Sequence, residues 1–327
     1  MAIARRELLG MGAAVAVSLA VSSCGGDGGS AHRSRPRRRP DPAPPATGLP
    51  GQPPPGSLYY GASLPYHLSL PSWERELGSV LGVNRSYFTP DANETAQLVS
   101  RCRDDLEAGR LPHVSTKALG TWAEIASGAE DDWLASMLYP LGEQEAPIIF
   151  TLHHEPENDA GPPGMTSTDY VAMQRRTIRV AAELAPQVIV APVLQHWTFD
   201  PLRDDSDPAL WIVDDASVIG LDVYNPWSPT NGKEWRTFGS KLAEVSGWFG
   251  DLPIVIGEYG CREDPLNPGL AAEWLRDAAD YARSHNVFSM SYFNSATDAT
   301  EGTWELSGET ELAFAELLAS DWVARPA

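Results

Sequence analysis

Short apolar runs alternate with longer amphipathic segments over residues 58–327 of the chain. The short runs are rich in β-branched and aromatic residues, and several are apolar at nearly every position. That pattern is typical of parallel strands buried on both faces. We predict eight strands, at Tyr59–Ser63, Asn84–Thr89, His113–Lys117, Pro147–His153, Val188–Leu194, Val218–Tyr224, Pro253–Glu258 and Val287–Phe293.

Helical patterns fall between these runs. Leu98, Cys102 and Leu106 recur at a spacing of four, which places one face of a helix over Asp91–Ala108. Three further helices are expected, at Thr168–Leu184 with Ser167 as its N-cap, at Leu270–Ser284 and at Glu311–Ser320. Eight strands, each followed by a helix, predict an α/β fold of the (β/α)8 (TIM) barrel type.

The first 23 residues have the pattern of an export signal. Arg5 and Arg6 precede a weakly apolar run from Met11 to Val21, which is too short to span a bilayer permanently. The arginine pair resembles a twin-arginine signal, and Val21-Ser22-Ser23-Cys24-Gly25 resembles a bacterial lipobox. We therefore predict an exported protein, lipid-anchored through Cys24 at the extracellular face of the membrane. An ordinary cleaved signal, which gives a secreted protein, is the alternative.

Residues 24–57 are rich in Gly and Ser and then in Arg and Pro, with few apolar side chains. Such a segment buries too little surface to offset its ordering entropy, so we predict a disordered linker. The three expected regions are thus a signal over 1–23, a linker over 24–57 and a folded domain over 58–327.

Composition and charge limit the partners of this domain. Hydrophobic residues make up 43% of the 327 residues and the net charge is −20, although residues 1–57 hold seven arginines and only three acidic residues. A body this acidic repels phosphate backbones, so nucleic acid is excluded as a partner, and a soluble monomer is expected.

Polar side chains gather where the predicted strands end. Glu155 follows the fourth strand, Asp222 and Tyr224 end the sixth, and Glu258 ends the seventh. Barrel enzymes place their chemistry at the carboxyl ends of the strands, and Asp222 and Tyr224 project to one side because they are two residues apart. Two carboxylates at one barrel mouth indicate paired acid and nucleophile chemistry.

These motifs resemble clan A of the retaining glycoside hydrolases, and family 26 with its β-mannanases most closely. His154-Glu155 matches the pair that ends strand four, Asp222-Val223-Tyr224 matches the motif of strand six, and Glu258-Tyr259-Gly260 matches that of strand seven. The resemblance implies cleavage of β-linked bonds in a polysaccharide such as mannan, with endo action. Glu155 would be the acid/base and Glu258 the nucleophile.

The resemblance also implies supporting roles. Arg85 on strand two would keep Glu258 ionised, and Tyr224 would donate a hydrogen bond to it. Asp222 would bind a sugar hydroxyl or position Glu155, and His154 would orient the acid or contact the sugar. Three aromatic residues at or after strand ends are expected either to stack on sugar rings or to serve as ordinary core aromatics, namely Trp197, Trp227 and Tyr292.

No cofactor or metal is expected, because His153-His154-Glu155 lacks the spacing of a helical zinc motif. Cys102 and Cys261 are expected to stay unpaired. Two other functions use the same features: a non-catalytic carbohydrate-binding lipoprotein, and a transglycosylase that acts on cell-surface glycans.

Overall fold

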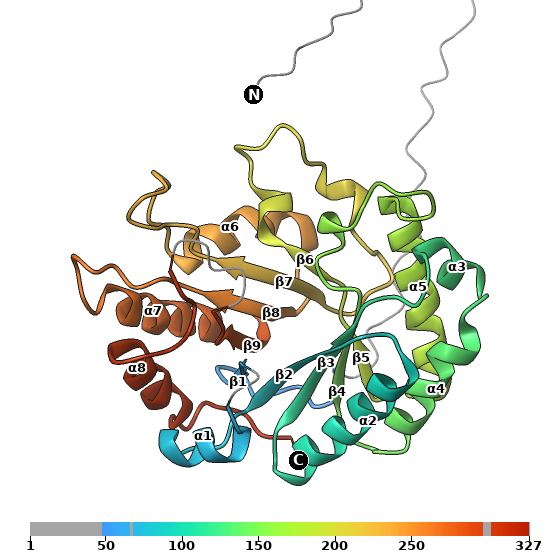
Figure 1. Cartoon of the computed structure of the whole chain (residues 1–327), viewed down its shortest axis with the longest axis horizontal. Helices are drawn as coiled ribbons and strands as arrows, with labels where there is room; N and C mark the ends of the chain where they lie inside the picture. The colour runs from blue at the N-terminus through green and yellow to red at the C-terminus, as the bar shows by residue number, and fades with distance from the viewer. Residues whose placement is uncertain (1–47, 66–67, 297–301, 327) are drawn as a thin grey trace, which may run out of the picture. The chain divides into compact units, whose positions relative to one another are not determined.

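A curled sheet of parallel strands lies at the centre of the computed structural model, which describes residues 48–65, 68–296 and 302–326 (Figure 1). Its strand order is β5-β4-β3-β2-β1-β9-β8-β7-β6. The strands are β1 (Tyr59–Ser63), β2 (Val83–Phe88), β3 (Leu111–Thr116), β4 (Ile148–Leu152), β5 (Val188–Val190), β6 (Val193–Gln195), β7 (Ile219–Tyr224), β8 (Ile254–Gly260) and β9 (Val287–Phe293). Apart from the divided fifth strand, the predicted bounds agree with these to within two residues.

The sheet closes through residues 188–195. β5 pairs with β4, whereas β6 pairs with β7, and only Ala191 and Pro192 separate the two short strands. The Ala191 amide donates to the Phe150 carbonyl on one side, and the Gly220 amide donates to the Pro192 carbonyl on the other. Pro192 has no N–H for the ladder, which explains the division of the predicted strand Val188–Leu194. β5 and β6 therefore act as one strand of a closed eight-stranded barrel.

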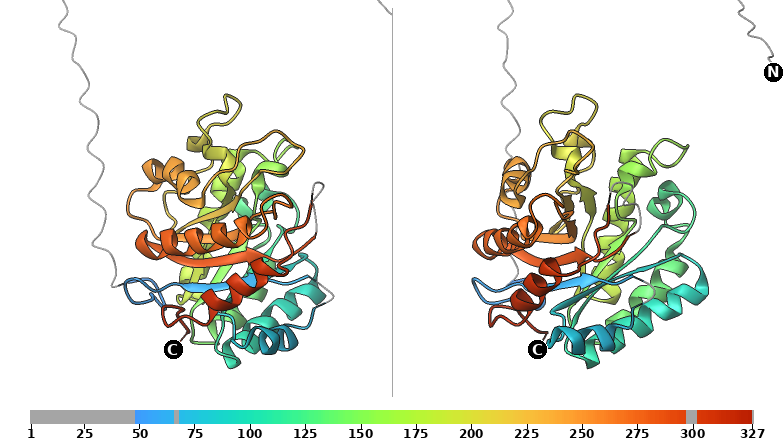
Figure 2. Two further views of the ribbon diagram at one scale, coloured as in Figure 1. Left: turned by 90° about the vertical axis from the view of Figure 1, so that its left-hand side faces the viewer. Right: turned by 60° about the vertical axis from the view of Figure 1, so that its left-hand side comes forward.

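Helices surround the barrel (Figure 2). They are α1 (Leu70–Leu77), α2 (Ala92–Glu107), α3 (Trp122–Ser127), α4 (Asp131–Gly142), α5 (Ser167–Leu184), α6 (Phe238–Phe249), α7 (Leu270–Ser284) and α8 (Glu309–Leu318). The N-cap of α5 is Thr166 rather than the expected Ser167, because Thr166 and Asp169 form a reciprocal capping box. None of the described helices is long and apolar enough to cross a membrane.

One crossover departs from the expected pattern of a helix after every strand. Between β6 and β7 the chain, which is described throughout this stretch, forms only the short 3-10 helices η2 (His196–Phe199) and η3 (Pro208–Leu210). The expectation was therefore wrong at this position. The segment lacks the long stripe of apolar residues that would hold an α-helix against the sheet.

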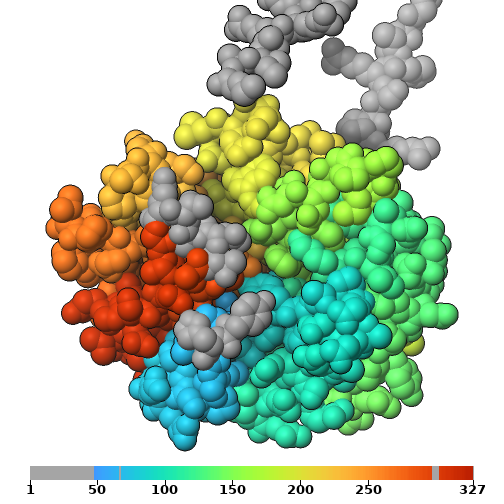
Figure 3. All heavy atoms as spheres, in the orientation of Figure 1, coloured from blue at the N-terminus to red at the C-terminus, as the bar shows by residue number. Residues whose placement is uncertain are grey.

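The first and last helices of the domain close the outer layer together. The Trp73 indole in α1 donates to Glu311 in α8, and the rings of Trp73 and Phe314 stack with centroids 5.6 Å apart. Figure 3 shows the corresponding blue and red segments side by side. The two ends of the folded chain thus stabilise each other.

The amino end of the barrel interior is sealed by an apolar cluster. Its members come from early positions of the strands or, for Ala191 and Val218, from residues just before a strand: Tyr59, Val83, Leu111, Ile149, Ile189, Ala191, Val218, Val255 and Phe288. Leu49 packs against this cluster, and the Tyr59 hydroxyl donates to the Gly51 carbonyl at 2.7 Å, so the folded unit extends ahead of the expected boundary at Leu58. The signal and Cys24 lie outside the described residues. With the amino end filled, polar groups gather at the carboxyl end.

Candidate active site

A bulge in β8 sets the position of Glu258. Leu221 pairs with Ile256 and Asp222 pairs with Glu258, so Gly257 is the extra residue. A Cβ on Gly257 would lie 2.7 Å from Oδ1 of Asp222, closer than real Cβ atoms come. Glycine at this position thus allows the Asp222 and Glu258 carboxylates to lie side by side.

Two tyrosines hold the Glu258 carboxylate. The Tyr87 hydroxyl donates to Oε1 at 2.7 Å, and the Tyr224 hydroxyl donates to Oε2 at 2.6 Å. Burial, followed by the Glu258 charge, raises the pKa of both phenols well above their usual range, so both stay protonated as donors. The carboxylate is fixed in one orientation with both oxygens engaged.

Glu155 lies in a tight turn just beyond β4. Both His153 and Glu155 have left-handed backbone conformations, with φ of 59° and 49°. Such conformations cost non-glycine residues on the order of 1–3 kcal/mol each and persist where the surroundings enforce them. Here the Glu155 amide donates to the Val193 carbonyl at 3.0 Å, and Asn158 donates to Oε2 of Glu155 at 3.0 Å.

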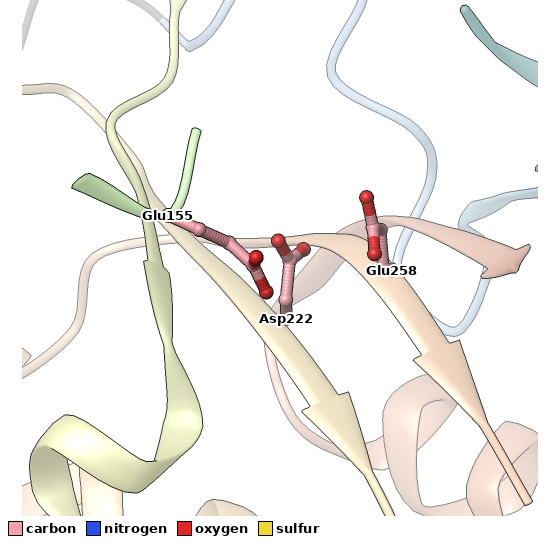
Figure 4. A group of neighbouring side chains, drawn as sticks. All are labelled: Glu155, Asp222 and Glu258. Carbon is pink, nitrogen blue, oxygen red and sulfur yellow. The ribbon is translucent and has the colours of Figure 1, made fainter. Parts of the chain in front are cut away.

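The three carboxylates converge at the barrel mouth. One oxygen from each of Glu155, Asp222 and Glu258 lies within 4.8 Å of the other two. Figure 4 shows Asp222 between the other two side chains. The positions expected from the ends of strands four, six and seven are thus brought together.

Crowding of these carboxylates changes their proton affinity. Burial and then the Glu258 charge raise the pKa of Glu155 to about 8, so Glu155 carries its proton at neutral pH. Burial, followed by the charges of Glu258 and Glu155, also raises the pKa of Asp222 well above its usual range. The mouth therefore offers a protonated acid close to a carboxylate that two phenols hold.

Arg85 and Asp222 supply buried polar groups without a protein partner. Within the described residues, neither the three guanidinium nitrogens of Arg85 nor the two oxygens of Asp222 have a hydrogen-bond partner. The Arg85 guanidinium lies 4.6 Å from the centre of the Tyr87 ring. Buried groups left unpaired cost about 1–3 kcal/mol, a cost that a hydroxyl-rich ligand would remove. Among the described residues Arg85 thus makes no hydrogen bond to Glu258, and its charge opposes the upward pKa shifts of Glu155 and Asp222.

The two histidines of the turn face different surroundings. His154 lies at the mouth, with its ring 5.4 Å from that of Tyr87 and Nδ1 3.4 Å from the Ser115 hydroxyl. Burial and then the Arg85 charge hold the pKa of His154 well below its usual range, so this ring is neutral. The His153 Nδ1 accepts from the Ala118 amide and the Trp122 indole, which leaves its Nε2–H to donate to Asp159.

Of the expected aromatic contacts, Tyr292 is a correction. Its ring is buried, and its hydroxyl donates to the Cys261 carbonyl, so Tyr292 belongs to the core rather than the mouth. The next residue, Phe293, points the other way because side chains alternate along a strand. The Phe293 ring is edge-on to those of Tyr87 and Tyr224, with centroids 6.5 and 6.1 Å away.

The two expected tryptophans already have protein partners. The Trp197 ring lies under the Arg203 guanidinium at 4.1 Å, and the Trp227 ring packs edge-to-face against Trp235 at 5.2 Å. Both indoles are half-buried. As sugar contacts they stay predictions.

Sequence reasoning missed three residues at the mouth. Tyr87 was detectable, since it is two positions after Arg85 on the same strand and therefore on the same face. Phe293 directly follows Tyr292, the residue that the sequence indicated as a sugar contact. Trp304, whose ring packs 4.8 Å from that of Tyr224, lies between β9 and α8 and has no local signal.

Three clustered carboxylates are also a donor set that suits a divalent cation. The Arg85 charge near these carboxylates and the two phenol donors on Glu258 favour an uncharged, hydroxyl-bearing ligand instead. Cys102 and Cys261 are both buried and free, as expected.

No family model and no curated protein matches the chain. Among solved structures, the chain is similar to the GH5_18 protein from Streptomyces cattleya in complex with GlcNAc, with a TM-score of 0.56 and 15% identity over 81% of this chain and 80% of that one. It is similar to XacCel5A in complex with cellopentaose, with a TM-score of 0.58 and 12% identity over 80% and 99%. It is also similar to a double mutant of a Cellulomonas fimi endo-β-1,4-mannanase, with a TM-score of 0.51 and 15% identity over 81% and 71%. At these identities the likeness shows the fold, and the barrel expected from the sequence is confirmed.

Proposed function

We propose that the protein is a retaining glycoside hydrolase that cleaves β-linked bonds, with Glu258 as nucleophile and Glu155 as acid/base. One observation carries the proposal: a carboxyl group with a pKa of about 8 has an oxygen within 4.8 Å of one on a second carboxylate held by two phenols. Retaining glycosidases pair a protonated acid with an ionised carboxylate in this way.

In the first step, Glu258 attacks the anomeric carbon. A bond forms between its carboxylate oxygen and that carbon, and the bond to the leaving oxygen breaks. Glu155 gives its proton to the leaving oxygen, so the departing sugar leaves as an alcohol. The result is a covalent glycosyl ester on Glu258 and an ionised Glu155.

In the second step, Glu155 removes a proton from a water molecule. The water oxygen attacks the anomeric carbon from the face that the leaving group vacated, and the ester bond to Glu258 breaks. Two displacements return the original anomeric configuration and restore both carboxyl groups. The short separation supports this route, since inverting enzymes leave about 6.5–9.5 Å between their carboxyl groups to admit a water.

The unpaired groups of the mouth support recognition of a sugar. Asp222 lies between the two reacting carboxyls, where it would accept from a hydroxyl of the bound sugar, and Arg85 would donate to another. His154 lies beside Tyr87 and would contact the same ring. These contacts would also orient the anomeric carbon toward Glu258.

For the substrate we propose mannan or a related β-linked polysaccharide, cleaved internally. Support comes from the sequence resemblance to β-mannanases and from one of the similar structures, which is that of an endo-β-1,4-mannanase. A transglycosylase would use the same residues, and products in which a sugar rather than water is the acceptor would identify it. Export with a lipid anchor on Cys24 belongs to the same proposal, on the evidence of the sequence alone.

Proton NMR of the first product tests the central claim. The purified protein would be incubated with β-1,4-mannan, mixed-linkage glucan and xylan in turn. We expect hydrolysis of at least one, with a β-configured first product that mutarotates later. An α-configured first product would reject the double displacement, and binding without cleavage of any glycan would indicate a carbohydrate-binding protein.

A further inference from the structure

Glu157 is an acidic residue that this mechanism does not use. It lies in the short helix η1 (Pro156–Asn158), two residues after Glu155. Its Oε1 accepts from the Gln195 amide at 3.0 Å and also from the Thr198 hydroxyl. Both donors belong to the segment where β6 ends and η2 begins. The Glu157 side chain thus bonds the turn that carries Glu155 to a separate part of the mouth.

Burial of the second oxygen of the Glu157 carboxyl group costs stability. Oε2 is buried and has no hydrogen-bond partner among the described residues. Burial raises the pKa of Glu157 to about 7 despite the donors on Oε1. A glutamine would make the same two bonds through its carbonyl without a buried charge. If Glu157 only linked these two segments, a glutamine would serve as well. The link alone therefore does not explain an ionisable group at this position.

Charged and titratable groups surround Glu157 from every neighbouring element. Glu155 lies on the same turn, Asp222 comes from β7, Tyr170 from α5, and Lys117 from the end of β3. Lys117 is half-exposed and donates to Asp159 and to the His154 carbonyl. The Glu157 charge raises the pKa of Glu155, adding to the larger effects of burial and Glu258. Like charges nearby favour the protonated form of a carboxyl group.

We propose that Glu157 is a positioning residue for the acid/base, which holds the Glu155 turn against the Gln195–Thr198 segment and electrostatically keeps the proton on Glu155. The inference rests on the proposed function, because it assigns Glu157 a task only if Glu155 is the acid. It adds a residue that the sequence motifs did not indicate.

The backbone explains why such a tie is needed. Glu155 has a left-handed conformation, which the turn does not adopt without support. The Glu155 amide bonds to Val193, and Glu157 bonds to Gln195 and Thr198, so the turn is fastened twice to one strand end. Thr198 also adjoins Trp197. A sugar that stacks on the Trp197 ring would therefore bind to the same segment that holds the Glu155 turn.

Two variants separate charge from attachment. Glu157→Gln removes the charge and keeps an acceptor for both bonds. Thr198→Val removes one bond and keeps the carboxyl group, although the loss of this donor raises the pKa of Glu157. A 13C NMR titration of the Glu155 carboxyl, assigned by its loss in Glu155→Gln, reports its pKa directly and needs no substrate. The alkaline limb of kcat/KM on β-1,4-mannan or cello-oligosaccharides, whichever is hydrolysed, reports the same group in turnover.

We expect Glu157→Gln to move both the Glu155 titration and the alkaline limb down by about half a pH unit or more. Thr198→Val should lower kcat with a smaller downward movement, because its Glu157 can still ionise. An unchanged Glu155 titration in Glu157→Gln, or equal movements in both variants, would overturn the inference. The proposed function would then stand, since it fails on a different result, namely full activity of Glu155→Gln on the oligosaccharide. If Glu157→Gln does not fold, an unchanged kcat in Thr198→Val overturns the inference equally.

Discussion

Gly257 and Asp222 are in such close contact that no side chain fits between them: a Cβ on Gly257 would lie 2.7 Å from Oδ1 of Asp222. Gly257 is the extra residue of the bulge that places Glu258 opposite Asp222. The arrangement of the two carboxylates thus depends on a residue that has no chemistry of its own.

Gly257→Ala is expected to displace Asp222 or to shift the β8 backbone. Overpacking of this kind costs about 1–3 kcal/mol in stability, and misplacement of reacting groups by about 1 Å costs roughly 10²-fold in kcat. Denaturant unfolding and steady-state kinetics measure the two effects. Gly247→Ala is the matched control, since an added Cβ there meets nothing within 4 Å. Equal activity of both variants would contradict the steric account.

Removal of the proposed nucleophile and of the proposed acid should have different effects. Glu258→Ala should abolish turnover of every substrate, because no glycosyl ester forms. Glu155→Ala should lose about 10²–10⁴-fold on polysaccharide, the scale of general acid catalysis. An aryl β-glycoside with an activated leaving group needs no acid, so this variant should still form the ester and then hydrolyse it slowly.

Added azide discriminates between the two assignments. It needs no general base, so it should restore turnover of Glu155→Ala and give a glycosyl azide with retained configuration. Mass spectrometry and NMR identify the product. Rescue of Glu258→Ala instead, with inversion, would mean that the two roles are reversed.

The two tyrosine hydroxyls that donate to Glu258 should each contribute to kcat. Tyr87→Phe and Tyr224→Phe each remove one hydrogen bond to a charged group, worth about 1.5–3 kcal/mol, so each should lower kcat roughly 10- to 150-fold. Tyr259→Phe is the control, because that hydroxyl donates to Tyr60 away from the mouth at 2.8 Å. A loss confined to KM would show that the phenols bind substrate rather than hold the carboxylate.

The raised pKa values predict a stability that falls as the pH rises. Glu155 has a folded pKa of about 8 and an ordinary value of 4.5, so the folded state holds a proton that the unfolded chain releases between these limits. The free energy of unfolding therefore decreases from pH 4.5 to pH 8 through this group. Glu155→Gln should raise Tm at pH 8 by about 2–4 °C, or about 1 kcal/mol, and less at pH 5. Calorimetry at both values is the measurement, and an equal change at both would contradict the shift.

Cys24→Ser tests the proposed anchor. The variant should move from the membrane fraction to the medium without loss of activity, because a diacylated cysteine holds a protein firmly and an unmodified segment does not. Immunoblots of the fractions provide the measurement. Equal partitioning of variant and wild type would contradict the lipid anchor and favour an ordinary cleaved signal.

Prediction from sequence succeeded for features that the two-residue repeat of a strand or the end of a strand reveals. The apolar runs located the strands, and the polar residues that follow them located Glu155, Asp222 and Glu258. It failed where a single position decides the face, as with Tyr292 and Phe293, since a shift of one residue exchanges inside and outside. The bulge at Gly257 and the approach of Trp304 depend on contacts between distant segments, which no local pattern contains.

The segment between β6 and β7 is a place where relatives of this barrel could diverge in specificity. With two short turns in place of an outer helix, it need not keep a 3.6-residue apolar repeat, so changes in length beyond Phe199 would cost the sheet little. Its first residues, by contrast, hold the Glu155 turn through Thr198. Evolution or a designer could thus rebuild this segment and leave the three carboxylates in place.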